Sequence, residues 1–139
     1  MKKIVSLFVF ALMLIFSGYY NVSAYENPYF FTKTGITMNS WTNILGNNEW
    51  VTKTTWSNQT ITITAASTKQ TSDCTECTYA ARVFDPNNNQ GVLGSTIKKG
   101  QTRTFLGSNA SSPGQFNVMI QRVGFSLWNN TVSGYWTYD

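Results

Sequence analysis

The segment Thr60–Ala65 limits the fold more than any other part of this 139-residue chain, because its sequence, TITITA, alternates between threonine and apolar residues. A period of two places Ile61, Ile63 and Ala65 on one face and the threonines on the other, which fits a half-buried β-strand and does not fit a helix. Threonine and isoleucine are β-branched, and such residues favour strands. The segment therefore predicts a strand with one face in a core.

Similar segments recur along the chain at intervals of roughly 8–12 residues, which is typical of all-β folds. No long apolar repeat with a 3.6-residue period is present. Further strands are predicted at residues 50–56, 78–84, 92–97, 102–106, 115–123, 125–128 and 131–138, with a less regular one near 36–41. Turns are predicted around Gly100 and at Asn129-Asn130, because glycine and asparagine tolerate the left-handed backbone of tight turns. We expect an all-β fold in which residues 25–139 form one antiparallel β-sandwich domain, jelly-roll or immunoglobulin-like.

The N-terminal segment has the three parts of a secretory signal peptide. Lys2 and Lys3 are followed by an uncharged apolar run from 4 to 18, and Val22-Ser23-Ala24 supplies compact residues for cleavage after Ala24. The alternative is an uncleaved anchor, but a spanning helix needs about 20 apolar residues and this run is shorter. We therefore predict a signal-peptide helix at residues 1–24 and a secreted product, residues 25–139.

Net charge gives little information about a partner. Two of the ten basic residues lie in the signal peptide, so eight remain against six carboxylates, a net charge of +2. This balance predicts no nucleic-acid partner, and it leaves the oligomeric state open.

Cys74 and Cys77 are the two cysteines of the chain. In an exported protein a structural disulfide is the first expectation. A redox pair would need a βαβ setting, which the sequence does not show, and free or intermolecular thiols are the remaining alternative.

Catalytic and metal-binding patterns are sparse. The chain contains no histidine, which is the commonest general base and metal ligand, and it has no pair of placed carboxylates such as a glycosidase needs. Asp85, Asn87 and Asn89 resemble the start of a calcium loop, but the glycine and glutamate of an EF-hand are missing, so we predict a plain turn. Calcium held by backbone carbonyls is the alternative. We expect no enzyme activity, no catalytic residue and no cofactor.

Aromatic residues are the best candidates for a binding surface. Exposed rings could contact sugar rings or lie at a membrane surface, whereas buried rings would only pack in the core. Because neighbours on a strand point to opposite faces, Tyr135 should face outward if Trp136 is buried. Lys98, Lys99 and Arg103 are candidate contacts to an anionic surface, with a solvated turn as the alternative. The candidate aromatic residues are Trp41, Trp50, Trp56, Trp128, Tyr135 and Trp136.

The C-terminal run Val132-Ser133-Gly134-Tyr135-Trp136 resembles a motif that ends short secreted Gram-positive proteins of unknown function. The general plan, a signal peptide followed by a small β domain, is similar to that of the lactococcin 972-type bacteriocins. The chain departs from the bacteriocin pattern in its length, its two cysteines and its lack of histidine. The resemblance implies a β-sandwich and contributes no functional residue.

These observations lead to three functional hypotheses. The first is a secreted, non-enzymatic protein that binds a surface of the bacterial envelope, a glycan or a membrane, with bacteriocin-like activity. The second is a module that binds wall glycan or extracellular matrix. The third is a small secreted hydrolase.

Overall fold

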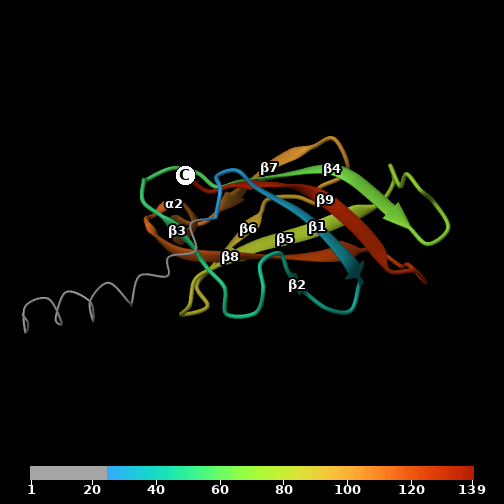
Figure 1. Ribbon diagram of the computed structural model, residues 1–139, viewed down its shortest axis with the longest axis horizontal. Coiled ribbons are helices and arrows are strands. Elements are labelled where there is room, and N and C mark those ends of the chain that lie inside the picture. Colours follow the sequence, from blue (N-terminus) through green and yellow to red (C-terminus); the bar gives the residue numbers. More distant parts are fainter. Residues whose placement is uncertain (1–24) are drawn as a thin grey trace, which may run out of the picture.

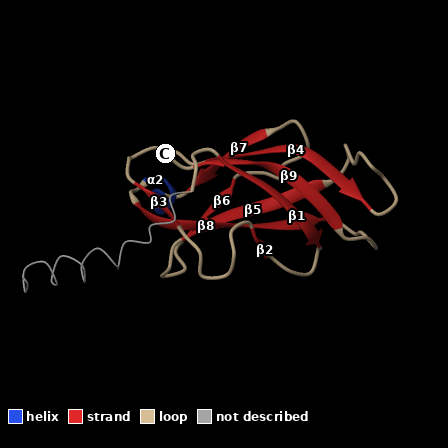
Figure 2. Cartoon of the chain, in the orientation of Figure 1, coloured by secondary structure: helices blue, strands red, loops and turns tan. Residues whose placement is uncertain are grey.

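β-Strands make up about half of the described part of the chain, residues 25–139 of the computed structural model (Figures 1 and 2). The predicted signal peptide, residues 1–24, lies outside the described residues. The elements are β1 (Tyr29–Ile36), β2 (Thr42–Asn43), β3 (Val51–Lys53), β4 (Thr60–Thr68), β5 (Thr78–Phe84), β6 (Gln90–Leu93), β7 (Thr102–Leu106), the short helix α2 (Ser108–Ser111), β8 (Gly114–Val123) and β9 (Asn130–Thr137).

The strands form an antiparallel sheet in the order β1-β9-β4-β7-β6-β5-β8-β2, with β3 also paired to β8. Strand β7 connects the two halves, because its first residues pair with β4 and its last residues pair with β6. At the far edge, the Arg122 amide of β8 donates a hydrogen bond of 2.9 Å to the carbonyl of Thr37, just after β1. The sheet is therefore nearly closed into a barrel, an arrangement that covers exposed strand edges.

The predicted all-β antiparallel fold is confirmed. The finer prediction of a sandwich, jelly-roll or immunoglobulin-like, is not confirmed, because strand pairing continues from one half of the sheet to the other through β7. Alternation along a strand shows which face is inside but not how far the sheet curls, and so it could not distinguish a sandwich from a barrel.

The core lies inside the curled sheet and follows the predicted alternation. On β5 and β8, Ala81 pairs with Ile120 and Val83 with Val118, and all four side chains are buried. On β9, the indole of Trp136 is fully buried. Among the described residues, 25–139, the nine strands enclose one continuous hydrophobic core.

A β-bulge in β4 corrects one detail of the predicted pattern. The pairing with β9 shifts between Ile63 and Ala65, which inserts an extra residue and reverses the faces beyond it. Ile61 and Ile63 are buried as predicted, but Ala65 is exposed and Ala66 is buried in its place.

Several segments differ from the predicted strands, among them residues 37–41, which lie outside any strand. Residues 29–36 form the long strand β1, although the adjacent aromatic residues at its start do not alternate with polar ones. Residues 125–128 form a loop, and Asn130 is a buried residue of β9 rather than part of a turn. The Asn130 carboxamide oxygen accepts hydrogen bonds from the Tyr79 hydroxyl at 3.3 Å and the Arg122 guanidinium at 3.0 Å. The buried Tyr79 and the half-buried Arg122, partners that the sequence does not reveal, explain its position.

Candidate functional site

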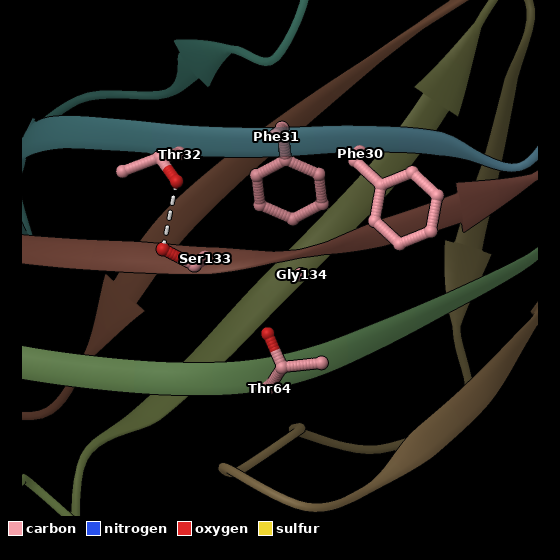
Figure 3. A pocket seen from close by; sticks show the side chains of 6 residues that line it. All are labelled: Phe30, Phe31, Thr32, Thr64, Ser133 and Gly134. Atoms are coloured by element: carbon pink, nitrogen blue, oxygen red, sulfur yellow. Dashed lines mark hydrogen bonds between the residues drawn. The ribbon is translucent and has the colours of Figure 1, made fainter. Parts of the chain in front are cut away.

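A hollow of about 290 Å³ opens on the outer surface where β1, β9 and β4 lie side by side (Figure 3). It lies on the side of the barrel, and none of its lining side chains carries a charge. The lining residues are Phe30, Phe31, Thr32, Thr64, Ser133 and Gly134. The volume is close to the lower end of the range for small-molecule sites, so the hollow suits a ligand of about one sugar ring.

The exposed ring of Phe30 stands at one side of the hollow and packs against Tyr135, which is not one of the lining residues. Phe30 of β1 is 67% exposed, and its ring centroid lies 5.6 Å from that of Tyr135, its cross-strand neighbour on β9. Tyr135 is half-buried and points outward, as expected from the burial of Trp136. The pair forms an exposed apolar surface with a phenolic hydroxyl at its edge, a combination that suits an amphipathic ligand.

Hydroxyl groups occupy the other side of the hollow. Thr32 and Ser133 share a hydrogen bond of 2.8 Å between their side chains, and the exposed Thr64 is on β4, across β9 from Thr32 (Figure 3). Each hydroxyl can both donate and accept a hydrogen bond. The hollow therefore joins an aromatic surface to neutral polar groups.

The shape of the hollow depends on Gly134. A Cβ atom at this position would lie 2.0 Å from the carbonyl oxygen of Thr62, so no other residue fits without a movement of β4. The bulge of β4 lies beside it, between Ile63 and Ala65. Glycine in a strand often marks such a close approach of two backbones.

The other predicted aromatic residues are dispersed. Trp136 is fully buried and its Nε1 donates a hydrogen bond of 2.9 Å to the side chain of Gln59, so it does not reach a ligand on the surface. Trp56 is 77% exposed on the loop between β3 and β4, outside the hollow. Trp41 and Trp50 are half-buried on the outside of the sheet. The structure therefore does not gather the tryptophans into one site.

Trp41 and Trp50 each have a defined packing partner. The guanidinium of Arg82 lies 4.4 Å from the Trp41 ring centroid, a cation–π contact. Trp50 meets Phe84 edge to face, with ring centroids 5.4 Å apart. Both indoles therefore cover the outside of β5.

Trp128 lies elsewhere, on the loop between β8 and β9, with two neighbours that the sequence pattern had assigned to a strand. Phe125 and Leu127 are 78% and 76% exposed. The ammonium group of Lys69 lies 5.8 Å from the Trp128 ring centroid.

The basic residues that were predicted to contact an anionic surface mostly interact with partners within the protein. Lys98 forms an ion pair with Glu76 at 3.2 Å, and Lys99 forms one with Asp73 at 2.8 Å. Arg103 donates hydrogen bonds to Ser95, to Gln101 and to its neighbour's carbonyl. These residues do not form an unpaired basic patch.

Cys74 and Cys77 lie at disulfide-bonding distance, with Cα atoms 5.4 Å apart in the loop between β4 and β5. The amide of Cys74 donates a hydrogen bond of 2.7 Å to the carbonyl of Ala66, which holds the loop against the end of β4. This position fits the predicted structural role.

The turn after β5 is held by its own aspartate. The Asp85 carboxylate accepts hydrogen bonds from the amides of Asn87 and Asn89, both at 2.9 Å. Burial alone would raise the pKa of Asp85, but the hydrogen bonds from Asn89 and Asn87 outweigh it and the pKa is lowered. An oxygen that a calcium ion would need is thus used within the turn. Residues 25–139 contain no cluster of three or more metal-ligating side chains.

The most buried charge lies far from the hollow. Lys53 is almost completely buried, and its ammonium group donates to the carbonyl of Thr55 and, at 2.8 Å, to the Ser57 hydroxyl. Burial lowers the pKa of Lys53, which the nearby Asp139 carboxylate partly offsets. These groups hold the loop after β3 to the last residue, and none of them lines the hollow.

Sequence reasoning missed Phe30, the most exposed ring of the hollow, and the exposed pair Phe125 and Leu127. The run Tyr29-Phe30-Phe31 could have indicated an outward ring, because one of two adjacent aromatic residues on a strand must face outward. Gly124, before the second group, has a positive φ of 82° and marks the end of β8.

Comparison with known proteins finds no matching family model, no matching curated protein and no matching solved structure. Among the described residues no helix has the length and apolar character needed to span a membrane. The resemblance to small secreted Gram-positive proteins therefore stays a prediction.

Proposed function

We propose that residues 25–139 are a secreted, non-enzymatic module that binds a surface of the bacterial envelope, and that this surface is a wall glycan. The observation that carries the proposal is the exposed ring of Phe30, supported by its contact with Tyr135, beside the hydroxyls of the hollow. A sugar ring has an apolar face and a rim of hydroxyl groups. The Phe30 ring would stack against the face, and Thr32, Ser133 and Thr64 would form hydrogen bonds to the rim.

The size of the hollow predicts weak binding of a single sugar. A hexose has about 12 non-hydrogen atoms, and about 0.3 kcal/mol for each atom corresponds to a Kd of a few millimolar. A polymer displays many copies of the sugar at high local concentration, so retention on an insoluble glycan is the sensitive measurement.

The test is a pull-down of residues 25–139 on purified cell-wall sacculi and on a panel of insoluble glycans. We expect retention by at least one of them, and we expect Phe30→Ala to reduce that retention at least about fivefold, since a stacked ring contributes about 1 kcal/mol or more. Trp56→Ala is the matched control, because Trp56 is an exposed ring outside the hollow. It should bind like the unchanged domain.

The outcomes separate the function from the site. If no sacculus or glycan retains the domain, the proposed function is wrong. If retention depends on Trp56 and not on Phe30, glycan binding stands and the hollow is the wrong site. Release of soluble sugar from the same samples, reproduced with independent preparations, would contradict a non-enzymatic role and favour the hydrolase hypothesis.

A further inference from the structure

The loop between β8 and β9, residues 124–129, presents large apolar side chains to solvent, and we call it the apolar loop. Phe125 is 78% exposed, Leu127 is 76% exposed and Trp128 is 37% exposed. Single exposed apolar residues are common, but three large ones within four positions form a patch that favours a partner.

The apolar loop forms a tip at one end of the barrel. Val123 ends β8 and Asn130 begins β9, so the loop lies at the opposite end of β9 from the C-terminal residue Asp139 (Figure 1). The loop of residues 69–77 reaches the same end, because Thr68 pairs with Asn130. The hollow lies on the side of the barrel, so the two surfaces are separate.

The base of the apolar loop is held in place by hydrogen bonds. The hydroxyl of Ser126 donates to the carbonyl of Trp128 at 2.9 Å and accepts from the amide of Trp128 at 3.3 Å. The buried side chain of Asn130 donates to the same carbonyl at 3.4 Å. This turn holds Phe125 and Leu127 outward in the free protein, so little further ordering is needed on binding.

The charge around the tip is positive. The exposed Lys69 lies over the Trp128 ring, and Arg122 adds a second positive charge at the end of β8, with its guanidinium turned toward Asn130 and the Tyr79 ring. Within residues 25–139, neither of these cations is in an ion pair, whereas Asp73 and Glu76 at the same end are already paired with Lys99 and Lys98. Cations beside exposed apolar residues complement an anionic membrane surface.

We propose that the apolar loop is a membrane-insertion tip that enters a lipid bilayer carrying anionic headgroups. Phe125 and Leu127 would enter the edge of the hydrocarbon region, Trp128 would lie at headgroup level, and Lys69 would contact the anionic groups. A stable protein interface buries about 800 Å² on each partner, which three side chains on a narrow tip do not supply. A bilayer requires no shaped partner surface, so it fits the tip better.

This proposal does not depend on glycan binding, because it uses other residues and another probe. The measurement is co-sedimentation of residues 25–139 with vesicles of phosphatidylcholine, with and without phosphatidylglycerol. We expect binding to the anionic vesicles that weakens as salt is added, since the ionic contacts are screened. The double variant Phe125→Ser and Leu127→Ser should reduce binding at least about tenfold, because it removes most of the inserted apolar area.

A matched control is available on the other side of the molecule. Val92 and Leu106 are a cross-strand pair that is 51% and 55% exposed, so Val92→Ser with Leu106→Ser removes a smaller exposed apolar surface away from the tip. This variant should bind vesicles like the unchanged domain. Lys69→Glu should weaken binding to anionic vesicles while leaving the fold intact, which circular dichroism would check.

Several results would overturn the proposal. One is the absence of binding to either vesicle type by the folded domain. Another is an equal loss of vesicle binding in the Val92→Ser, Leu106→Ser variant and in the Phe125→Ser, Leu127→Ser variant. Equal binding to both vesicle types would contradict the anionic preference. Finally, if sedimentation shows a dimer that the tip variant dissociates, the tip is an interface between copies of the chain and the membrane proposal is wrong.

Discussion

Asp139 should stabilise the fold through its carboxylate, although it is an exposed residue at the end of the sequence. Its two oxygens accept hydrogen bonds from the amides and hydroxyls of Thr54 and Thr55, at distances from 2.7 to 3.1 Å. Burial alone would raise the pKa of Asp139, but these hydrogen bonds outweigh it and lower the pKa to about 2. The carboxylate thus holds the loop after β3 to the end of β9.

The pKa sets the size and the pH range of the effect. The difference between the ordinary value of 3.8 and about 2, at 1.36 kcal/mol for each pKa unit, gives an upper limit of about 2.4 kcal/mol. Solvent screens a partly exposed group, so we expect a contribution of about 1 kcal/mol. Because the folded-state pKa is the lower one, this stability is present above pH 3.8 and is lost as the pH falls through about 2.

The assay is urea unfolding of residues 25–139 and of the variant Asp139→Asn, at neutral pH and at acidic pH down to the folded-state pKa. The variant should lose about 1 kcal/mol of unfolding free energy at neutral pH, and the difference should shrink in acid. Glu76→Gln is the control, since it removes a carboxylate whose ion pair with Lys98 is largely exposed, and it should change stability by only a few tenths of a kcal/mol. An Asp139→Asn variant as stable as the unchanged domain, or a difference that grows in acid, would refute the reasoning.

Three further changes test the packing, each by denaturant unfolding. Gly134→Ala should cost more than about 2 kcal/mol, because its Cβ would overlap a backbone carbonyl of β4, and a near-neutral result would contradict that close approach. Trp136→Phe should cost about 2–4 kcal/mol, since it leaves the buried Gln59 oxygen without its donor and opens space in the core. Replacing Cys74 and Cys77 together by serine should cost about 2 kcal/mol, as expected for a short closed loop. A reductant should destabilise the unchanged domain by the same amount and should leave the stability of the variant unchanged.

The candidate site was only partly predictable. Tyr135 was expected to face outward, and it does so because the next ring is in the core. Phe30 was missed because β1 begins with adjacent aromatic residues, and their order does not show which ring is buried. The basic residues were recognised as charged, but their acidic partners lie more than twenty positions away and meet them only in the folded chain.

The sequence alone was sufficient for the all-β class and for the buried faces of the regular strands. In segments such as 78–84 and 115–123, side chains two positions apart share a face whatever the strand order, so alternation specifies which residues enter the core. Strand order, the curl of the sheet and the exposure of single rings depend on contacts between distant segments. The bulge in β4 shows the difference: one extra residue, accommodated against β9, exposed Ala65 and buried Ala66. The apolar loop shows it again, because Asn130 is held in the core by Tyr79 and Arg122 and leaves Phe125 and Leu127 at the tip.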